Sequence, residues 1–63
     1  MIVIVNGEEK LITEGTKIRH FTEELKGHDR ALVTELNGLI VTDEDTVLSG
    51  GDSLEIVTFV GGG

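Results

Sequence analysis

The order of apolar and polar residues predicts a β-hairpin at the start of the chain. Residues 1–5 are apolar and mostly β-branched. Asn6-Gly7 follows at once, and this pair is a strong signal for a two-residue turn of type I′. A second extended segment, residues 8–13, then leads to a break at Glu14-Gly15. We therefore expect two antiparallel strands joined at Asn6-Gly7.

A single amphipathic helix is expected next. Ile18, Phe21 and Leu25 recur at helical spacing, so they form one apolar face that we expect in the core. Thr16 is placed to cap the start of the helix. Gly27 is placed to end it, because glycine readily takes the left-handed conformation that stops a helix.

The rest of the chain is predicted to be extended. Residues 32–36 alternate up to a second turn pair, Asn37-Gly38; residues 39–41 resume an extended run, and residues 53–60 are the longest β-prone segment. A hairpin, a crossing helix and further strands place the last strand parallel to the first, with the helix on one face. The expected fold class is α+β: a β-grasp with a mixed sheet of four to five strands and one main helix.

The first and last strands predict an uncovered apolar surface. Side chains alternate along a strand, so the residues that face the core fix those that face away. The predicted inward set is Met1, Val3, Val5, Leu54, Ile56 and Val60. The outward set is Ile2, Ile4, Val57 and Phe59, which we expect to lie together and to be rimmed by acids such as Glu55. Such a surface on a small protein usually marks a docking site. We therefore assign partner binding to Ile2, Ile4, Val57, Phe59 and, next to the end of the chain, Val60.

Length and composition restrict the function. Sixty-three residues allow one domain with a small core, which leaves little chain for a catalytic pocket, so we do not expect an enzyme. Twelve acidic and five basic residues give a net charge of −7, which disfavours nucleic acid and favours basic partners. Without cysteine or paired histidines no metal site is expected. Neither a signal peptide nor a membrane span is recognisable, so we expect a cytoplasmic protein.

The chain ends in bare glycine. Phe59-Val60 runs directly into Gly61-Gly62-Gly63. Glycine has no Cβ and accepts nearly any backbone angle, so a flexible tail of three could enter a channel too narrow for branched residues. The carboxylate of Gly63 is then the group presented to another protein.

Four features together resemble the ubiquitin-like sulfur carriers, and among them the ThiS family of thiamine biosynthesis, which is related to the molybdopterin carrier MoaD. The resemblance covers essentially the whole chain as a single domain, residues 1–63. Its features are Val5-Asn6-Gly7, Gly15-Thr16 before the helix, Leu36-Asn37-Gly38 with Ile40-Val41, and Gly51-Asp52-Ser53-Leu54-Glu55-Ile56-Val57 running into the glycine tail. The family's minimal tail has two glycines, and this chain has three.

The resemblance implies that Gly63 carries sulfur. A ThiF-like, ubiquitin-activating-type enzyme would use ATP to adenylate the Gly63 carboxylate. A persulfide from a sulfur-donor enzyme would displace AMP, and the thiocarboxylate would supply sulfur to a ThiG-like thiazole synthase. Gly61 and Gly62 would serve as the extended arm, with no intrinsic cofactor and a free protein that is monomeric. Three alternatives stay open: a carrier for molybdopterin or another acceptor, a protein modifier joined to lysine through Gly63, and a passive interaction domain.

Overall fold

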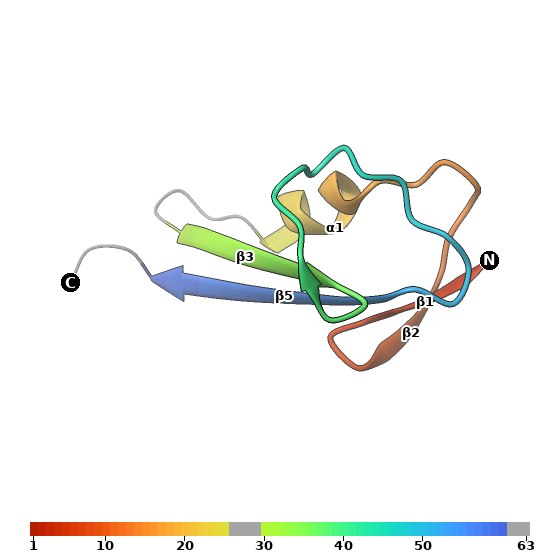
Figure 1. Ribbon diagram of the computed structural model, residues 1–63, viewed down its shortest axis with the longest axis horizontal. Coiled ribbons are helices and arrows are strands. Elements are labelled where there is room, and N and C mark those ends of the chain that lie inside the picture. The colour runs from red at the N-terminus through yellow and green to blue at the C-terminus, as the bar shows by residue number, and fades with distance from the viewer. Residues whose placement is uncertain (26–29, 61–63) are drawn as a thin grey trace.

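The computed structural model describes residues 1–25 and 30–60, with the main chain alone at Arg30 and Val60. Figure 1 shows one helix lying across one side of a sheet. The elements in chain order are β1 (Ile2–Val5), β2 (Glu8–Leu11), α1 (Ile18–Leu25), β3 (Arg30–Leu36), β4 (Leu39–Ile40) and β5 (Ser53–Val60). The second strand is shorter than the predicted 8–13 and ends at Leu11. The expected helix stop, Gly27, lies outside the described residues.

The sheet has five strands in the order β2-β1-β5-β3-β4. β1 and β5 are parallel, whereas the β1–β2, β3–β5 and β3–β4 pairs are antiparallel. The predicted mixed β-grasp sheet, with its last strand parallel to its first, is therefore confirmed. Both hairpin turns are confirmed as well: Asn6 and Asn37 have φ values of 50° and 52°, and Gly7 and Gly38 follow at 83° and 85°.

The core lies between α1 and the sheet. Its buried members are Val3, Val5, Ile12, Ile18, Phe21, Leu48, Leu54 and Ile56. Two expected core residues lie at its margin instead. Leu25, in the last turn of α1, is 38% exposed, and the helix buries Thr22 completely. Met1 is 44% exposed because it precedes β1 and lies at the rim, where its Cβ approaches Gly50 and its ammonium group donates to the carbonyl of Ile12.

The start of α1 is held by a distant loop. The prediction that Thr16 caps the helix is wrong, because its hydroxyl donates to the carbonyl of Thr13, three residues earlier. The first helical amides, those of Ile18 and Arg19, donate to the carbonyls of Thr46 and Glu44 at 3.0 and 2.8 Å. Main-chain carbonyls of the 42–48 loop thus satisfy donors that a side-chain cap would otherwise satisfy.

Candidate functional site

β5 brings the chain to its glycine tail and is supported unequally on its two sides. It pairs with β3 from Leu54, opposite Leu36, to Val60, opposite Arg30. With β1 it pairs only near its start, where Ile4 is opposite Ser53 and Val5 is opposite Leu54. The far half of β5 therefore extends beyond β1 with β3 as its strand neighbour (Figure 1). The predicted tail, Gly61 to Gly63, lies outside the described residues.

The two Asn-Gly turns also hold β5 in place. Where β1 ends, the side-chain oxygen of Asn6 accepts a hydrogen bond from the amide of Ile56 at 2.7 Å, while the amide of Asn6 donates to the carbonyl of Leu54. At the other turn, Asn37 accepts from the amide of Ser53 and donates to the Asp52 carboxylate, both at 3.0 Å. Asn6 thus adds one rung to the parallel ladder with a side chain in place of main chain.

An apolar patch covers the end of the sheet nearest the tail. On the face opposite α1, Val33 is paired with Val57, and Ala31 with Phe59. Val33, Val57 and Phe59 are 37%, 45% and 50% exposed. We call Ala31, Val33, Val57 and Phe59 the tail-side patch. The outward direction predicted for Val57 and Phe59 is confirmed, and β3 adds two members.

A second apolar patch lies at the other end of the same face. Ile2 and Ile4 are 50% and 38% exposed, which confirms that they face outward, and the pairing of Ile2 with Leu11 adds a third exposed side chain. We call Ile2, Ile4 and Leu11 the hairpin-side patch. The prediction that Ile2 and Ile4 lie together with Val57 and Phe59 is wrong. Ile4 is level with Ser53, and Val57 lies four residues farther along β5, about 13 Å at the rise of a strand.

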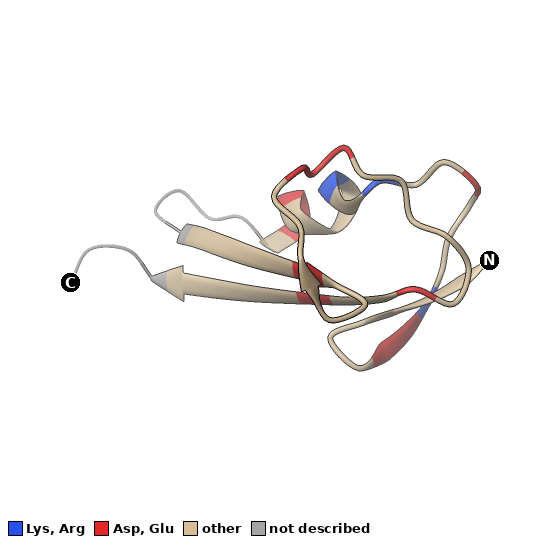
Figure 2. Ribbon diagram, viewed as in Figure 1, with Lys and Arg blue, Asp and Glu red and all other residues tan. Residues whose placement is uncertain are grey.

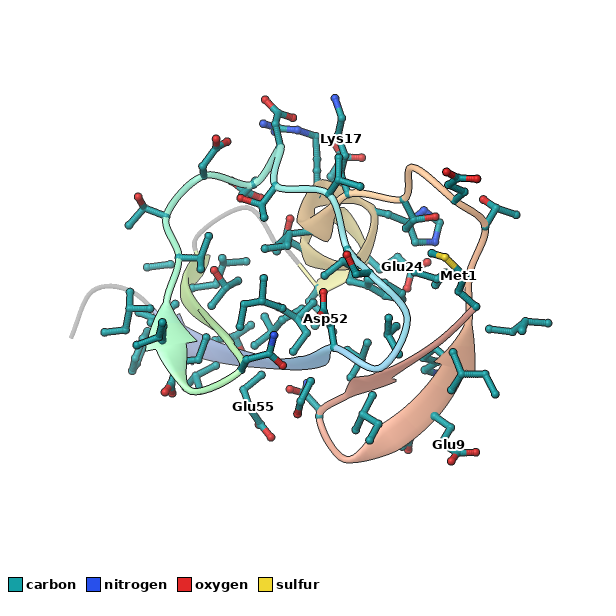
Figure 3. All side chains as sticks on the ribbon, turned by 45° about the vertical axis from the view of Figure 1, so that its right-hand side comes forward. Met1, Glu9, Lys17, Glu24, Asp52 and Glu55 are labelled. Carbon is teal, nitrogen blue, oxygen red and sulfur yellow. The ribbon has the colours of Figure 1, made fainter. Side chains whose placement is uncertain are left out.

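Carboxylates occupy the space between the two patches. Glu35 of β3 is directly opposite Glu55 of β5, in a row that is two residues from Val33 and Val57. Figure 3 shows Glu55 and Glu9 projecting from the side of the sheet that faces away from α1. Between this row and Arg30 at the start of β3, residues 31–34 of β3 and 56–60 of β5 carry no charge (Figure 2). Like charges facing each other across a ladder are unfavourable. This row therefore gives a cationic partner a favourable place to bind beside apolar surface.

Two ion pairs and a side-chain hydrogen bond connect α1 and Lys17, the residue before it, to the 42–48 loop. Asp45 accepts from Arg19 at 3.0 Å and lies 3.9 Å from Lys17. The hydrogen bond and charge of Arg19 lower the pKa of Asp45, and Asp45 raises the pKa of Arg19. Thr22 donates to the Glu44 carboxylate. These contacts lie on the helix side of the sheet, away from the two patches.

Other kinds of site find little support in the described part of the chain. Within residues 1–25 and 30–60, no three His, Cys, Asp or Glu side chains come together as a metal site would require. The same residues include no helix long and apolar enough to cross a membrane. The feature that distinguishes the molecule is an exposed sheet face that leads to a C-terminal tail.

Comparison with known proteins identifies what this face and tail belong to. The family model of ThiS matches residues 3–63, from β1 to the last glycine. The chain belongs to the ThiS family. A crystal structure of the thiamine biosynthesis protein ThiS from Geobacter metallireducens is similar over the whole of both chains, with 28% sequence identity and a TM-score of 0.70. None of the curated proteins matches the chain. ThiS-family proteins are small ubiquitin-like sulfur carriers and not catalysts, in agreement with the expectation from chain length.

The structure thus places four of the five predicted docking residues on the outer face of this ThiS-family fold. Ile2, Ile4, Val57 and Phe59 are exposed there, while Val60 is described by its main chain alone. Sequence analysis did not include Ala31, Val33 and Leu11. The alternation of residues 30–36 could have indicated the first two. Leu11 becomes part of a patch only through its pairing with Ile2.

Proposed function

We propose that this protein carries sulfur for the thiazole of thiamine as a thiocarboxylate on Gly63. The observation that carries the proposal is the match to the ThiS family through residue 63, which includes all three tail glycines. It is supported by the architecture of β5, which delivers the tail from the margin of an exposed apolar patch. The thiamine biosynthesis assignment of the Geobacter protein favours this acceptor over molybdopterin.

The chemistry explains why a protein of this kind needs partners. A carboxylate is a poor acyl donor. A ThiF-like enzyme would therefore use ATP to form the Gly63 acyl-adenylate and release pyrophosphate, with its own cations and metal stabilising the charge that develops. A persulfide from the sulfur-donor enzyme then forms a bond to the acyl carbon as the bond to AMP breaks. Reductive cleavage of the sulfur–sulfur bond by a thiol leaves the thiocarboxylate for a ThiG-like synthase.

The fold contributes delivery and docking to this sequence of steps. Gly61 and Gly62 act as a narrow arm, because a Cβ in either residue would widen the chain where it enters the partner's active site. The tail-side patch, with Val57 and Phe59 at its centre, seats the partner next to that arm. Ile2 and Ile4 form a separate contact near the hairpin. The row of Glu35 and Glu55 between the patches favours a partner that is basic there.

The decisive test is the intact mass of the protein after incubation with ATP, the cognate activating enzyme and the sulfur donor. A mass increase equal to replacing one oxygen by sulfur, sensitive to a thiol-selective reagent, is the expected result. A variant whose Gly63 carboxylate is blocked as an amide should form neither the adenylate nor the sulfur-bearing species, while its far-UV circular dichroism spectrum is unchanged. Normal activation of that variant would refute the proposal. Heavier conjugates joined through Gly63 to lysine would identify a protein modifier instead.

A further inference from the structure

A groove on the helix side of the molecule is separate from the tail and from both patches. It lies between α1 and the β1–β2 hairpin and has a volume of about 230 Å³. Its apolar lining comes from Val5 and Phe21, each 7% exposed, and from Leu25, which is 38% exposed. This is enough space for one or two long side chains and too little for a typical small-molecule site, which encloses about 300 Å³ or more.

Acidic side chains stand at the rim of this groove. Glu8 of β2 and Glu24 of α1 contribute from opposite sides. Lys10 of β2 lines the groove as well, and its ammonium group lies 3.4 Å from Glu8, so that pair is already neutralised and Glu24 is the carboxylate open to a further cation. Among the described residues, Glu24 makes no ion pair. An apolar floor beside a carboxylate that no described residue pairs fits the side chain of Lys or Arg, whose methylene stem is apolar and whose head is cationic.

The same groove runs beside an open edge of the sheet. β2 is the outermost strand on its side and pairs only with β1 among the described residues. The Met1–Ile12 pair exchanges hydrogen bonds in both directions. Hydrogen-bonded pairs alternate in an antiparallel ladder, so Lys10 and Glu8 also direct their main-chain groups toward β1. The amides and carbonyls of Glu9 and Leu11 therefore point outward, where a further strand could bind them.

We propose that the β2 edge binds an extended basic segment of a partner protein, which adds a strand beside β2 and places Lys or Arg in the groove against Glu24. The main-chain groups of Glu9 and Leu11 supply the hydrogen bonds, as in other cases of strand addition. Side chains of the added strand alternate between the two faces. A basic residue toward the groove therefore has apolar neighbours in sequence, which lie on the opposite face beside Leu11.

Charge complementarity favours this occupant. The chain carries a net charge of −7, and Glu24 lies on the helix side of the sheet whereas Glu9 lies on the other side (Figure 3). A second copy of the chain would bring another β2, in which Glu8 and Glu9 outnumber Lys10, to the same edge. A basic segment gains from both carboxylate-bearing faces, whereas a second copy meets like charge.

The test uses the whole protein, labelled with ¹⁵N, and a synthetic peptide. The peptide is acetylated and amidated and alternates Val and Arg; one control replaces Arg by Gln, and another has the same composition with its Val and Arg residues in separate blocks. We expect the alternating peptide to shift the amide resonances of Glu9, Leu11 and Phe21 and to bind best of the three. Equal binding of the block control, or shifts confined to the face with Phe59, would overturn the proposal.

Two variants separate the groove from the edge. Glu24→Gln should weaken binding by roughly two- to fivefold, the value of one exposed ion pair, whereas Glu23→Gln, its exposed neighbour outside the groove, should leave binding unchanged. Glu9→Pro removes an outward amide without removing a hydrogen bond to β1, and should weaken binding roughly fivefold or more. Circular dichroism of each variant verifies folding. Unaltered peptide binding in both Glu24→Gln and Glu9→Pro would refute the proposal. The same resonance shifts on concentrating the protein without peptide would also refute it, because they would assign the β2 edge to a second copy of the chain.

Discussion

The Asn6 side chain offers the sharpest test of how the fold supports β5. Asn6 performs two tasks: it takes a left-handed backbone conformation at φ 50°, and its side-chain oxygen accepts the amide of Ile56 at 2.7 Å. Three substitutions separate these tasks. Asn6→Asp keeps an acceptor and tolerates the conformation, Asn6→Gly keeps only the conformation, and Asn6→Ala keeps neither.

The expected losses follow from these two tasks. An amide left without its acceptor in a partly buried position costs about 1–3 kcal/mol, which is the loss expected for Asn6→Gly. A left-handed alanine adds about 1–2 kcal/mol, so Asn6→Ala should lose about 2–5 kcal/mol. Asn6→Asp should stay within about 0.5 kcal/mol. A chain of 63 residues has a total free energy of unfolding of about 3–9 kcal/mol, so the alanine variant should lose roughly half of it.

Urea denaturation followed by far-UV circular dichroism is the suitable assay, because the chain has neither Trp nor Tyr for fluorescence. Asn37→Gly is the matched control. It removes hydrogen bonds that are exposed, so it should cost less than Asn6→Gly. Hydrogen exchange at the amide of Ile56 should accelerate in Asn6→Gly. If Asn6→Gly were as stable as the natural protein and the Ile56 amide stayed protected, Asn6 would be only a turn residue.

Three further outcomes are expected. Phe59→Asp should weaken binding to the activating enzyme while costing about 1 kcal/mol of stability or less, because Phe59 is half exposed. Thr58→Asp is its control, because Thr58 is exposed on the other face of the sheet. Equal effects of the two substitutions on binding would contradict the assignment of the docking surface to the face with Phe59. Arg19 lowers the pKa of Asp45, so their pairing stabilises the protein above the ordinary pKa near 3.8 and is lost as pH falls through the lower folded value. Asp45→Asn should therefore reduce the loss of stability at acid pH, measured as the urea midpoint against pH. An unaltered dependence on pH would show that the Arg19–Asp45 pair contributes nothing to stability. Added salt should slow association with a basic activating enzyme in stopped-flow measurements. An association rate that does not change with salt would indicate that the net negative charge contributes to solubility and not to partner capture.

Local sequence patterns were sufficient to predict the structure wherever a physical preference acts over a few residues. Asn-Gly pairs favour left-handed turns, so both hairpins could be predicted. Alternation fixed which side of β1 and β5 each residue occupies, and Ile2 and Phe59 accordingly face away from the helix. Helical spacing predicted the burial of Ile18 and Phe21. It did not show that Thr22 would be buried more fully than Leu25, because the 42–48 loop, with Glu44 bonded to Thr22, lies over that part of the helix.

The sequence by itself therefore determined the elements, their faces, the β-grasp order and the kinship with the ThiS family, since each follows from local preference or from resemblance along the chain. Only the tertiary structure decided how far β5 extends past β1. Ile4 and Ser53 are paired across a crossover of nearly fifty residues, and no local preference sets the register of strands so far apart in sequence. That register divides the outer face into two patches with carboxylates between them. It also leaves the edge of β2 open beside the groove.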